Sequence, residues 1–323
     1  MDPLTTRPAV LAALLGVATC AQLVAQGVAS TAGALLEMPA TPRALALQGA
    51  YASVVGDEGS IFVNPAGMAP IHHLALGVSY EQGVFGTKLT TGAFALRVGR
   101  HFDVGFGLMY LDFGGDSVIV PDPAFGGDRG IATGGLISAW NGLAVGAVAY
   151  RRGMLSLGAS VKALHELIGG GPANYSTTRI AGDLGFAVAV FDLISFGAVM
   201  QNIGGSAKAS DGSAAPLPRT TRVGFTLNFI DPQGTARLMA TTDWVKPPGG
   251  NAYWALGFEG GMVANGLGIL GRLGISAGRA ATDRRGYSLG AGLIVKGLRL
   301  DYAWQPYGAL AASEQRVGFR WIP

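Results

Sequence analysis

The chain has 323 residues, of which 49% are apolar and only 13% are charged, about half the charged share of a soluble globular protein. Its 52 glycines are more than twice the usual proportion, but no Gly-X-Y period or low-complexity tract accompanies them, which excludes collagen and a disordered chain. The net charge of +3 comes from scattered basic residues, so no nucleic-acid footprint is present. Mean hydropathy is +0.37, yet no apolar run of about 20 residues follows residue 30. These features favour a β-barrel closed within a membrane.

Residues 1–25 have the pattern of a secretory signal peptide. Arg7 gives a positive n-region, residues 9–21 form an apolar h-region too short for a stable anchor, and we place cleavage after Ala25. Two alternatives remain, namely a lipoprotein signal with Cys20 as the lipidated residue and an apolar first helix. Because Cys20 is the single cysteine, the mature chain has none, which suits export and excludes a cysteine-based metal site.

Residues 26–42 form a short leader with two prolines, and residues 43–71 differ from everything after them. The Ala-rich run 44–52 is expected to be helical. These residues are too apolar for a free periplasmic tail, and they lack the alternation of a strand.

Asp57 is a candidate N-cap for a second short helix. This helix should begin near Glu58, and Pro65 and Gly67 should end it. Asn64, just before that proline, can hydrogen-bond its own backbone in a tight turn.

From residue 73 onward, large apolar residues alternate strictly with small or polar ones. The first such stretch alternates Leu74, Leu76, Val78 and Tyr80 with Ala75, Gly77, Ser79 and Glu81. A soluble sandwich would carry long polar side chains on its outer face, whereas here the second face is mostly tiny. The pattern therefore predicts a barrel whose apolar face meets lipid and whose small or polar face lines the lumen. Closure is required because lipid offers no partner for edge N–H and C=O groups.

We predict an all-β fold, a 14-stranded antiparallel outer-membrane β-barrel. The expected strand spans are 72–82, 87–98, 102–113, 136–151, 154–168, 177–190, 193–202, 219–229, 236–245, 252–261, 268–278, 286–296, 298–306 and 314–321. An even number of strands suits a barrel in which both termini of the chain lie on the periplasmic side.

The links between strands fall into two groups. Short ones such as Arg152-Gly153 and Lys296-Gly297 are expected to be periplasmic turns, and the longer ones at 114–135, 169–176 and 203–218 to be outer loops. The fourth span contains the turn dipeptide Asn141-Gly142, but we keep it whole to preserve the even count.

Tyrosine and tryptophan occur towards the strand ends, where an aromatic girdle belongs. The candidates are Tyr80, Tyr110, Trp140, Tyr150, Trp244, Trp254, Trp304 and Trp321.

Two N-terminal motifs resemble the signature of the PorV/PorQ group of outer-membrane barrels, which are related to the FadL fatty-acid channels. They are the segment 43–57, RALALQGAYASVVGD, and the segment 61–68, IFVNPAGM. The hairpin around Tyr150-Arg151-Arg152 is also similar. The sequence departs from the family at Gln48, where Gly is usual, at Val63, where an aromatic residue often stands, and in the Ile322-Pro323 tail.

The resemblance implies that residues 43–71 fold inward as a hatch within a barrel of residues 72–323. Its motif residues here are Arg43, Gly49, Asp57, Asn64, Pro65, Ala66 and Gly67. A periplasmic helix outside the lumen is the alternative.

The strand faces also carry charges that should point into the lumen. These are Lys162, Arg179, Arg222, Arg272, Arg299, Arg320, Asp103, Asp183, Asp243, Glu259 and Asp301. We expect them to pair with one another and with the hatch, because an unpaired buried charge is costly. A polar, selective conduit is the alternative.

Enzyme-like motifs carry little weight in this chain. Residues 266–271 satisfy G-x-G-x-x-G and residues 274–278 satisfy G-x-S-x-G, but the glycine content alone produces roughly one such match by chance, and no βαβ context accompanies either. His165-Glu166 is not followed by a second His, and His72 and His73 point to opposite strand faces. We therefore expect no catalytic residue, no metal site and no cofactor.

Three functions remain open. The resemblance implies an accessory protein of type IX secretion that binds or shuttles secreted cargo. The alternative is a FadL-like channel for hydrophobic small molecules, and the third is an outer-membrane hydrolase. The expected partners are outer-membrane lipid together with cargo, secretion components or a hydrophobic ligand.

Overall fold

The computed structural model describes residues 33–69, 71, 73–125, 129–170, 174–191, 193–205, 207–208, 214–230, 235–277, 286–308 and 312–322. The predicted signal peptide with Cys20, the first residues of the leader, and His72 lie outside these ranges. No helix within them is long and apolar enough to cross a membrane.

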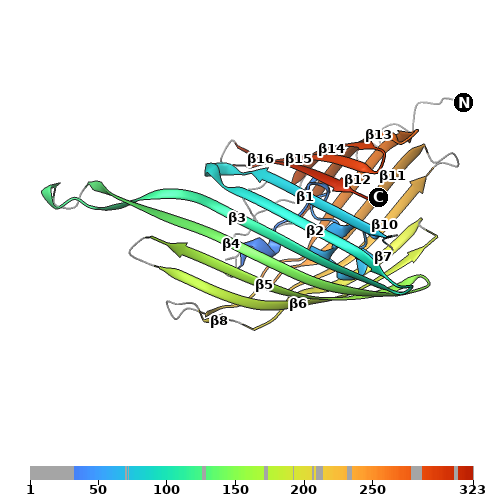
Figure 1. Ribbon diagram of the computed structural model, residues 1–323, viewed down its shortest axis with the longest axis horizontal. Helices are drawn as coiled ribbons and strands as arrows, with labels where there is room; N and C mark the ends of the chain where they lie inside the picture. The colour runs from blue at the N-terminus through green and yellow to red at the C-terminus, as the bar shows by residue number, and fades with distance from the viewer. Residues whose placement is uncertain are drawn as a thin grey trace, which may run out of the picture.

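Fourteen strands form one closed antiparallel barrel, as predicted (Figure 1). They are β1 (Leu74–Gln82), β2 (Lys88–Val98), β3 (Phe102–Pro121), β4 (Gly130–Arg152), β5 (Leu155–Gly169), β6 (Tyr175–Val190), β7 (Ile194–Ile203), β10 (Thr220–Ile230), β11 (Ala236–Lys246), β12 (Tyr253–Ala264), β13 (Leu267–Ala277), β14 (Tyr287–Val295), β15 (Leu298–Pro306) and β16 (Ser313–Trp321). Each strand pairs with its neighbours along the chain, and β1 pairs with β16 to close the wall.

The two faces of the wall differ as the alternation predicts. Val78, Leu157 and Val317 are 59%, 50% and 53% exposed on the outside, whereas the intervening Ser79 and Glu81 are buried inside. The predicted girdle residues are exposed or half-buried. With lipid around it, this apolar exterior is the favourable surface.

The strand bounds depart from prediction at the third and fourth spans. Residues 114–135, expected to be a loop, are largely β-strand, because β3 runs on to Pro121 and β4 starts at Gly130. The β-branched residues at 118–120 and 131 continue the ladder through two register shifts, one of them around Gly114, which has a φ of +80°. The two strands thus project past the rim of the barrel (Figure 1). β4 is continuous through Asn141-Gly142, as predicted.

Three other links contain short elements. The expected loop 203–218 holds a two-stranded pair, β8 (Ala207–Lys208) and β9 (Ala214–Ala215). Single 3₁₀ turns, η4 (Val84–Gly86) and η5 (Pro123–Phe125), lie in the β1–β2 and β3–β4 links. Along the chain, links at one end of the barrel alternate with links at the other. The first set consists mainly of short turns and the second of longer connections, and we call these ends the short-turn end and the long-loop end.

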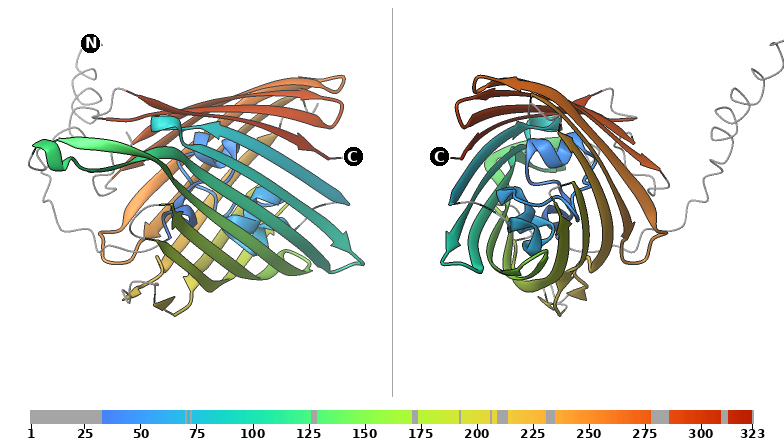
Figure 2. Two further views of the ribbon diagram at one scale, coloured as in Figure 1. Left: turned by 60° about the vertical axis from the view of Figure 1, so that its left-hand side comes forward. Right: turned by 90° about the vertical axis from the view of Figure 1, so that its right-hand side faces the viewer.

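Residues 33–69, called here the luminal segment, fill the inside of the barrel (Figure 2). The segment contains η1 (Ala34–Glu37), α2 (Pro42–Ala46), η2 (Glu58–Phe62) and η3 (Pro65–Met68). Residues 33–42, predicted to be part of a leader, are included, since Leu35 is fully buried.

Two helix predictions for this segment need correction. The helix expected over 44–52 ends at Ala46, because Gln48 and Gly49 have left-handed φ values of +54° and +73°. The second helix begins at Glu58 with Asp57 as its cap, as predicted, but it ends at Phe62. Pro65 starts another turn rather than ending this one, because the side chain of Asn64 caps it.

The luminal segment passes around the whole inner wall. Its contacts run from Leu164 on β5, at Gly33, to Arg316 on β16, Glu259 on β12, Asp243 on β11 and Ser195 on β7, and then back to Gly105 on β3, at Met68. The segment therefore resembles an internal ring more than a cork at one end.

Small residues on the wall make room for this ring. At eleven wall glycines a Cβ would lie less than 3 Å from an atom of the luminal segment: Gly77, Gly105, Gly107, Gly158, Gly185, Gly197, Gly224, Gly257, Gly274, Gly290 and Gly318. They come from ten of the fourteen strands. The high glycine content of the chain thus has a packing cause.

Candidate functional site

The inner wall offers the luminal segment two different surfaces. Strands β10 to β16 present charged and polar groups, whereas β2 to β4 present mainly aliphatic ones, to which β5 adds Leu164. The candidate site is this lumen, with the segment that fills it.

Eight charged side chains form one connected network, called here the charge network. Its four arginines and four carboxylates are Arg43, Arg272, Arg299, Arg320, Asp57, Glu58, Glu259 and Asp301. Three members come from the luminal segment and five from β12, β13, β15 and β16. Basic and acidic side chains are equal in number in this network.

Arg43 joins the luminal segment to the wall. Its guanidinium donates to both oxygens of Glu259, at 2.9 and 2.8 Å, and to Asp57 Oδ2 at 2.9 Å. Arg272 on β13 binds the same Glu259 at 2.6 Å and also Asp301 at 2.7 Å. A forked pairing of this kind fixes geometry as well as charge.

Asp57 and Glu58 lie close to arginines of the last two strands, β15 and β16. Arg320 lies 3.2 Å from Asp57 and 2.6 Å from Glu58, and Arg299 lies 4.0 Å from Asp57. Burial acts to raise the pKa of Asp57, but the positive charges of Arg320, Arg43 and Arg299 outweigh it and hold that pKa below its ordinary value. Burial raises the pKa of Glu58, and its one close arginine does not fully offset this effect.

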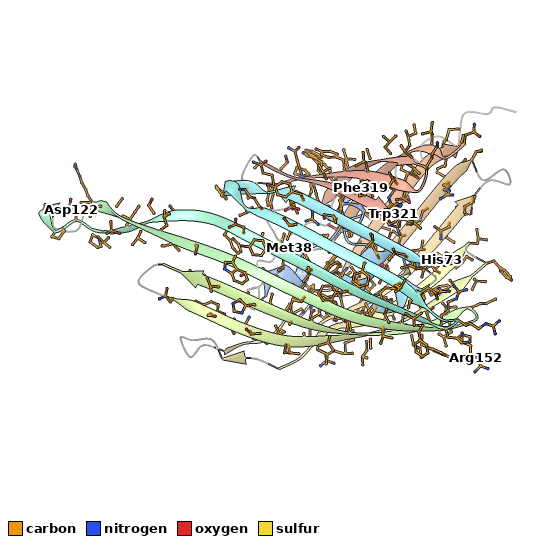
Figure 3. The ribbon with its side chains drawn as sticks, in the orientation of Figure 1. Met38, His73, Asp122, Arg152, Phe319 and Trp321 are labelled. Carbon is orange, nitrogen blue, oxygen red and sulfur yellow. The ribbon has the colours of Figure 1, made fainter. Side chains whose placement is uncertain are left out.

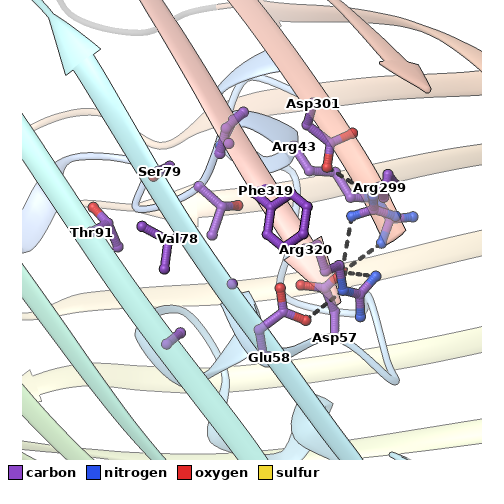
Figure 4. A pocket seen from close by; sticks show the side chains of 15 residues that line it. Arg43, Asp57, Glu58, Val78, Ser79, Thr91, Arg299, Asp301, Phe319 and Arg320 are labelled. Atoms are coloured by element: carbon purple, nitrogen blue, oxygen red, sulfur yellow. Dashed lines mark hydrogen bonds and ion pairs between the residues drawn. The ribbon is translucent and has the colours of Figure 1, made fainter. Parts of the chain in front are cut away.

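A cavity of about 20 Å³ lies between the charge network and strands β1, β2 and β16 (Figure 4). Ser79, Thr91 and Asp301 are among its lining residues. Pockets that hold drug-sized ligands measure about 300 Å³ or more, so this cavity does not accommodate an organic ligand.

Backbone contacts hold the middle of the luminal segment. Asp243 on β11 accepts hydrogen bonds from the N–H groups of Tyr51 and Ala52, both at 2.9 Å. Arg222 on β10 donates to the carbonyl of Gly49 at 3.0 Å and lies 3.9 Å from Asp243. Two predicted luminal charges thus bind peptide groups of the segment, with one loose ion pair between them.

The Asn-Pro-Ala-Gly motif binds the opposite wall. Asn64 donates to the carbonyl of Ala52 at 2.6 Å and to that of Phe186 on β6 at 3.2 Å, and its Oδ1 accepts from the N–H of Ala66 at 3.2 Å. The carbonyl of Gly67 accepts a hydrogen bond from the N–H of Gly56. Residue 67 has no room for a side chain, because a Cβ there would meet the Val54 carbonyl. The motif therefore shapes a tight turn and attaches it to β6.

Four predicted luminal charges, Lys162, Asp183, Arg179 and Asp103, pair away from the charge network. Lys162 binds Asp183 at 2.8 Å beside a register shift between β6 and β7, and Arg179 binds Glu166 at 2.6 Å. Asp103 binds Arg97 at 2.7 Å near the short-turn end. These pairs lie within the wall.

Sequence reasoning did not identify several residues of the lumen. The sequence predicts Glu58 only as a helix start, and no sequence pattern singles out Gln201, which donates to the Val63 carbonyl at 2.9 Å. The cluster of Arg316 with Glu81 and Glu314 was also missed, although the alternation places all three on the inward face. Counting every inward charge would have found it.

An aliphatic surface covers the other side of the lumen. Leu89 pairs with Leu111 across β2 and β3, and Met109 with Leu143 and then Leu164 across β3, β4 and β5. These inward side chains are buried in one cluster with Leu35, Leu36, Phe62 and Met68 of the luminal segment. An apolar inner face is unusual, because the interior of an outer-membrane barrel is ordinarily polar.

The enzyme-like motifs show no catalytic context. Residues 266–271 and Ser276 lie in the β12–β13 turn and along β13, and no helix follows in the described residues. No group of three or more metal-ligating side chains occurs within the part of the chain that the structure describes.

A closed antiparallel barrel with an apolar exterior and a charged, filled interior defines a class, the integral outer-membrane proteins of bacteria, and this chain is one of them. The sequence matches no protein-family model and no curated protein.

Solved structures of FadL-type barrels share the fold. A Pseudomonas aeruginosa FadL homologue is 14% identical, with 87% of this chain and 98% of that chain covered and a TM-score of 0.58. The Ralstonia pickettii toluene transporter TbuX is 17% identical. The match covers 87% of this chain and 96% of TbuX, with a TM-score of 0.55. CymD, a monoaromatic hydrocarbon channel, is 12% identical. The match covers 87% of this chain and 96% of CymD, with a TM-score of 0.57. These likenesses show the FadL-like fold, but not membership of the PorV/PorQ group.

Proposed function

We propose that the protein is a channel that admits small hydrophobic molecules through the outer membrane. The sequence left this function open as the alternative to a role in type IX secretion. The observation that carries the proposal is the aliphatic surface on the inner face of β2 to β4 and at Leu164 of β5, against which Leu35 and Leu36 pack. An apolar lining does not bind ions or sugars, the solutes of a porin. A hydrocarbon binds such a lining because both apolar surfaces are then removed from water. The similar structures described as toluene and hydrocarbon transporters support the same class of solute.

The luminal segment serves as a hatch in this proposal. The charge network and the glycine contacts attach it on the polar side, so an open aqueous pore along the axis is not expected. Single-channel recording of the full chain in planar bilayers tests this point. We expect no steady conductance, and a large, stable conductance would contradict the hatch assignment.

The transport proposal is tested in Gram-negative cells that express the full chain and have an intact outer membrane. Uptake of labelled toluene at low concentration is measured, since the lipopolysaccharide leaflet is the barrier that the channel would bypass. Leu111→Thr makes the inner surface more polar and should slow uptake, whereas Leu108→Thr, on the lipid face of the same strand, should not. Equal uptake with and without the protein would refute the proposal.

The role in type IX secretion that the motifs imply is a second proposal, carried by residues 43–57 and 61–68 alone. None of the similar structures supports it. Affinity capture of the full chain from its native envelope is the test. Recovery of cargo with a sorting domain would favour it, and recovery of none would count against it.

A further inference from the structure

The short-turn end of the barrel carries exposed positive charge. Its exposed basic residues are Arg100 in the β2–β3 turn, Arg152 at the end of β4, Arg237 at the start of β11 and Lys296 in the β14–β15 turn. No exposed acidic side chain lies at this end among the described residues, a set that does not include Asp192 and Asp231. At the opposite end Asp116 is exposed and Asp122 lies near the tip of the projecting strands (Figure 3).

Two neighbouring turns concentrate this charge. The pairing of β3 with β4 places Phe102 opposite Tyr150, and the N–H of Arg151 donates to the carbonyl of His101 at 2.7 Å. Residues 100–101 and 151–152 therefore lie side by side; we call them the basic turn surface. Asp103, the closest carboxylate on these strands, is fully buried and already binds Arg97 at 2.7 Å. Asp103 therefore does not neutralise the charges of Arg100 and Arg152.

An apolar belt borders the basic turn surface on the outside of the barrel. The rings of Phe102 and Tyr150 lie 5.2 Å apart, and both side chains are exposed. Met154 is 49% exposed, and Phe191 is 85% exposed with a φ of +50°, a conformation that is costly for an aromatic residue. Aromatic and apolar groups in this position mark the level where acyl chains give way to headgroups.

We propose that the basic turn surface binds the phosphate headgroups of anionic phospholipids in the leaflet around the short-turn end. Guanidinium groups suit phosphate oxygens, since they donate in a fork. The occupant follows from the continuity of the surface with the lipid-facing belt, because a headgroup bound at Arg100 and Arg152 would place its acyl chains against Phe102, Tyr150 and Met154. A soluble protein partner would have to sit within the headgroup layer to reach the same atoms. The site is separate from the lumen and does not depend on the transport proposal.

The test uses the full chain in nanodiscs that contain phosphatidylcholine with a minor share of phosphatidylglycerol. Native mass spectrometry then measures how many phosphatidylglycerol molecules remain bound on release. The double variant Arg100→Gln/Arg152→Gln should bind about fivefold more weakly per arginine removed, the effect of one basic residue near an anionic surface. The effect should diminish at high salt.

The matched control is Lys88→Gln/Lys246→Gln, two exposed basic residues at the long-loop end. It should retain phosphatidylglycerol as the unmodified protein does. Arg100→Lys/Arg152→Lys should recover part of the binding, because it keeps the charge without the fork. Unchanged retention in the glutamine variant, or an equal loss in the control, would overturn the proposal.

Discussion

The contact between wall glycines and the luminal segment can be tested with a single methyl group. Gly274 on β13 faces inward, and a Cβ there would lie 2.5 Å from the amide nitrogen of Gln48 and 2.7 Å from the carbonyl oxygen of Ala46. Ordinary contact begins near 3.4 Å, so Gly274→Ala requires the backbone of the segment to retreat by about 1 Å. Backbone atoms cannot rotate away as a side-chain tip does.

The expected cost follows from this displacement. Overpacking in a filled interior costs about 1–3 kcal/mol. A retreat at Ala46 also strains the hydrogen bond from Ser288 Oγ to its carbonyl, now 3.0 Å, and a bond of that kind is worth about 1 kcal/mol. We therefore expect Gly274→Ala to lower the free energy of unfolding by about 3 kcal/mol.

Urea unfolding of the full chain in lipid vesicles is the assay, and Gly92→Ala is the matched control. Gly92 lies on β2, and a Cβ there would meet nothing within 4 Å. Its substitution should change stability by less than about 0.5 kcal/mol. Brief channel openings in Gly274→Ala would agree with a loosened segment. If both variants were equally stable, the luminal segment would not be seated on the wall as described.

Three further predictions concern the luminal segment itself. Arg43→Met removes one guanidinium from Glu259 and Asp57 and should cost about 3 kcal/mol in the same unfolding assay, whereas the exposed Arg237→Met should be nearly neutral. Gln48→Gly removes a left-handed φ penalty and a buried amide nitrogen without a hydrogen bond, and should stabilise by about 1 kcal/mol; a loss would refute the strain argument. Because the pKa of Asp57 is lowered on folding, its contribution should be constant above about pH 4 and decline below it, so the stability gap between the protein and Asp57→Asn should narrow only in acid.

Much of the wall could be predicted from the sequence, because side chains of a barrel strand alternate with a period of two and each strand repeats the signal. The prediction was wrong where the pattern breaks. Around Gly114 the register shifts, so the alternation that marks residues 102–113 no longer identifies the extension to Pro121.

The lumen was less predictable. The inward direction of charges such as Arg272 and Asp301 follows from alternation, but their partners depend on how the closed wall brings distant residues together. Arg43 and Glu259 are 216 residues apart, and no local pattern relates them. Residues 33–42 belong to the predicted leader, and the burial of Leu35 becomes apparent only in the closed barrel.

The two sides of the luminal segment indicate where it would move if a solute enters. Ion pairs and peptide hydrogen bonds attach α2 and the turn after it, and a hydrocarbon offers nothing to replace them. η1 packs Leu35 and Leu36 against the aliphatic surface, and these are contacts for which an apolar solute competes directly. Leu35→Ala should therefore increase toluene uptake while lowering stability by about 3 kcal/mol. Leu45→Ala, an equally buried leucine in α2, should lower stability by a similar amount without increasing uptake. If both variants increased uptake equally, general loosening rather than release of η1 would be the cause.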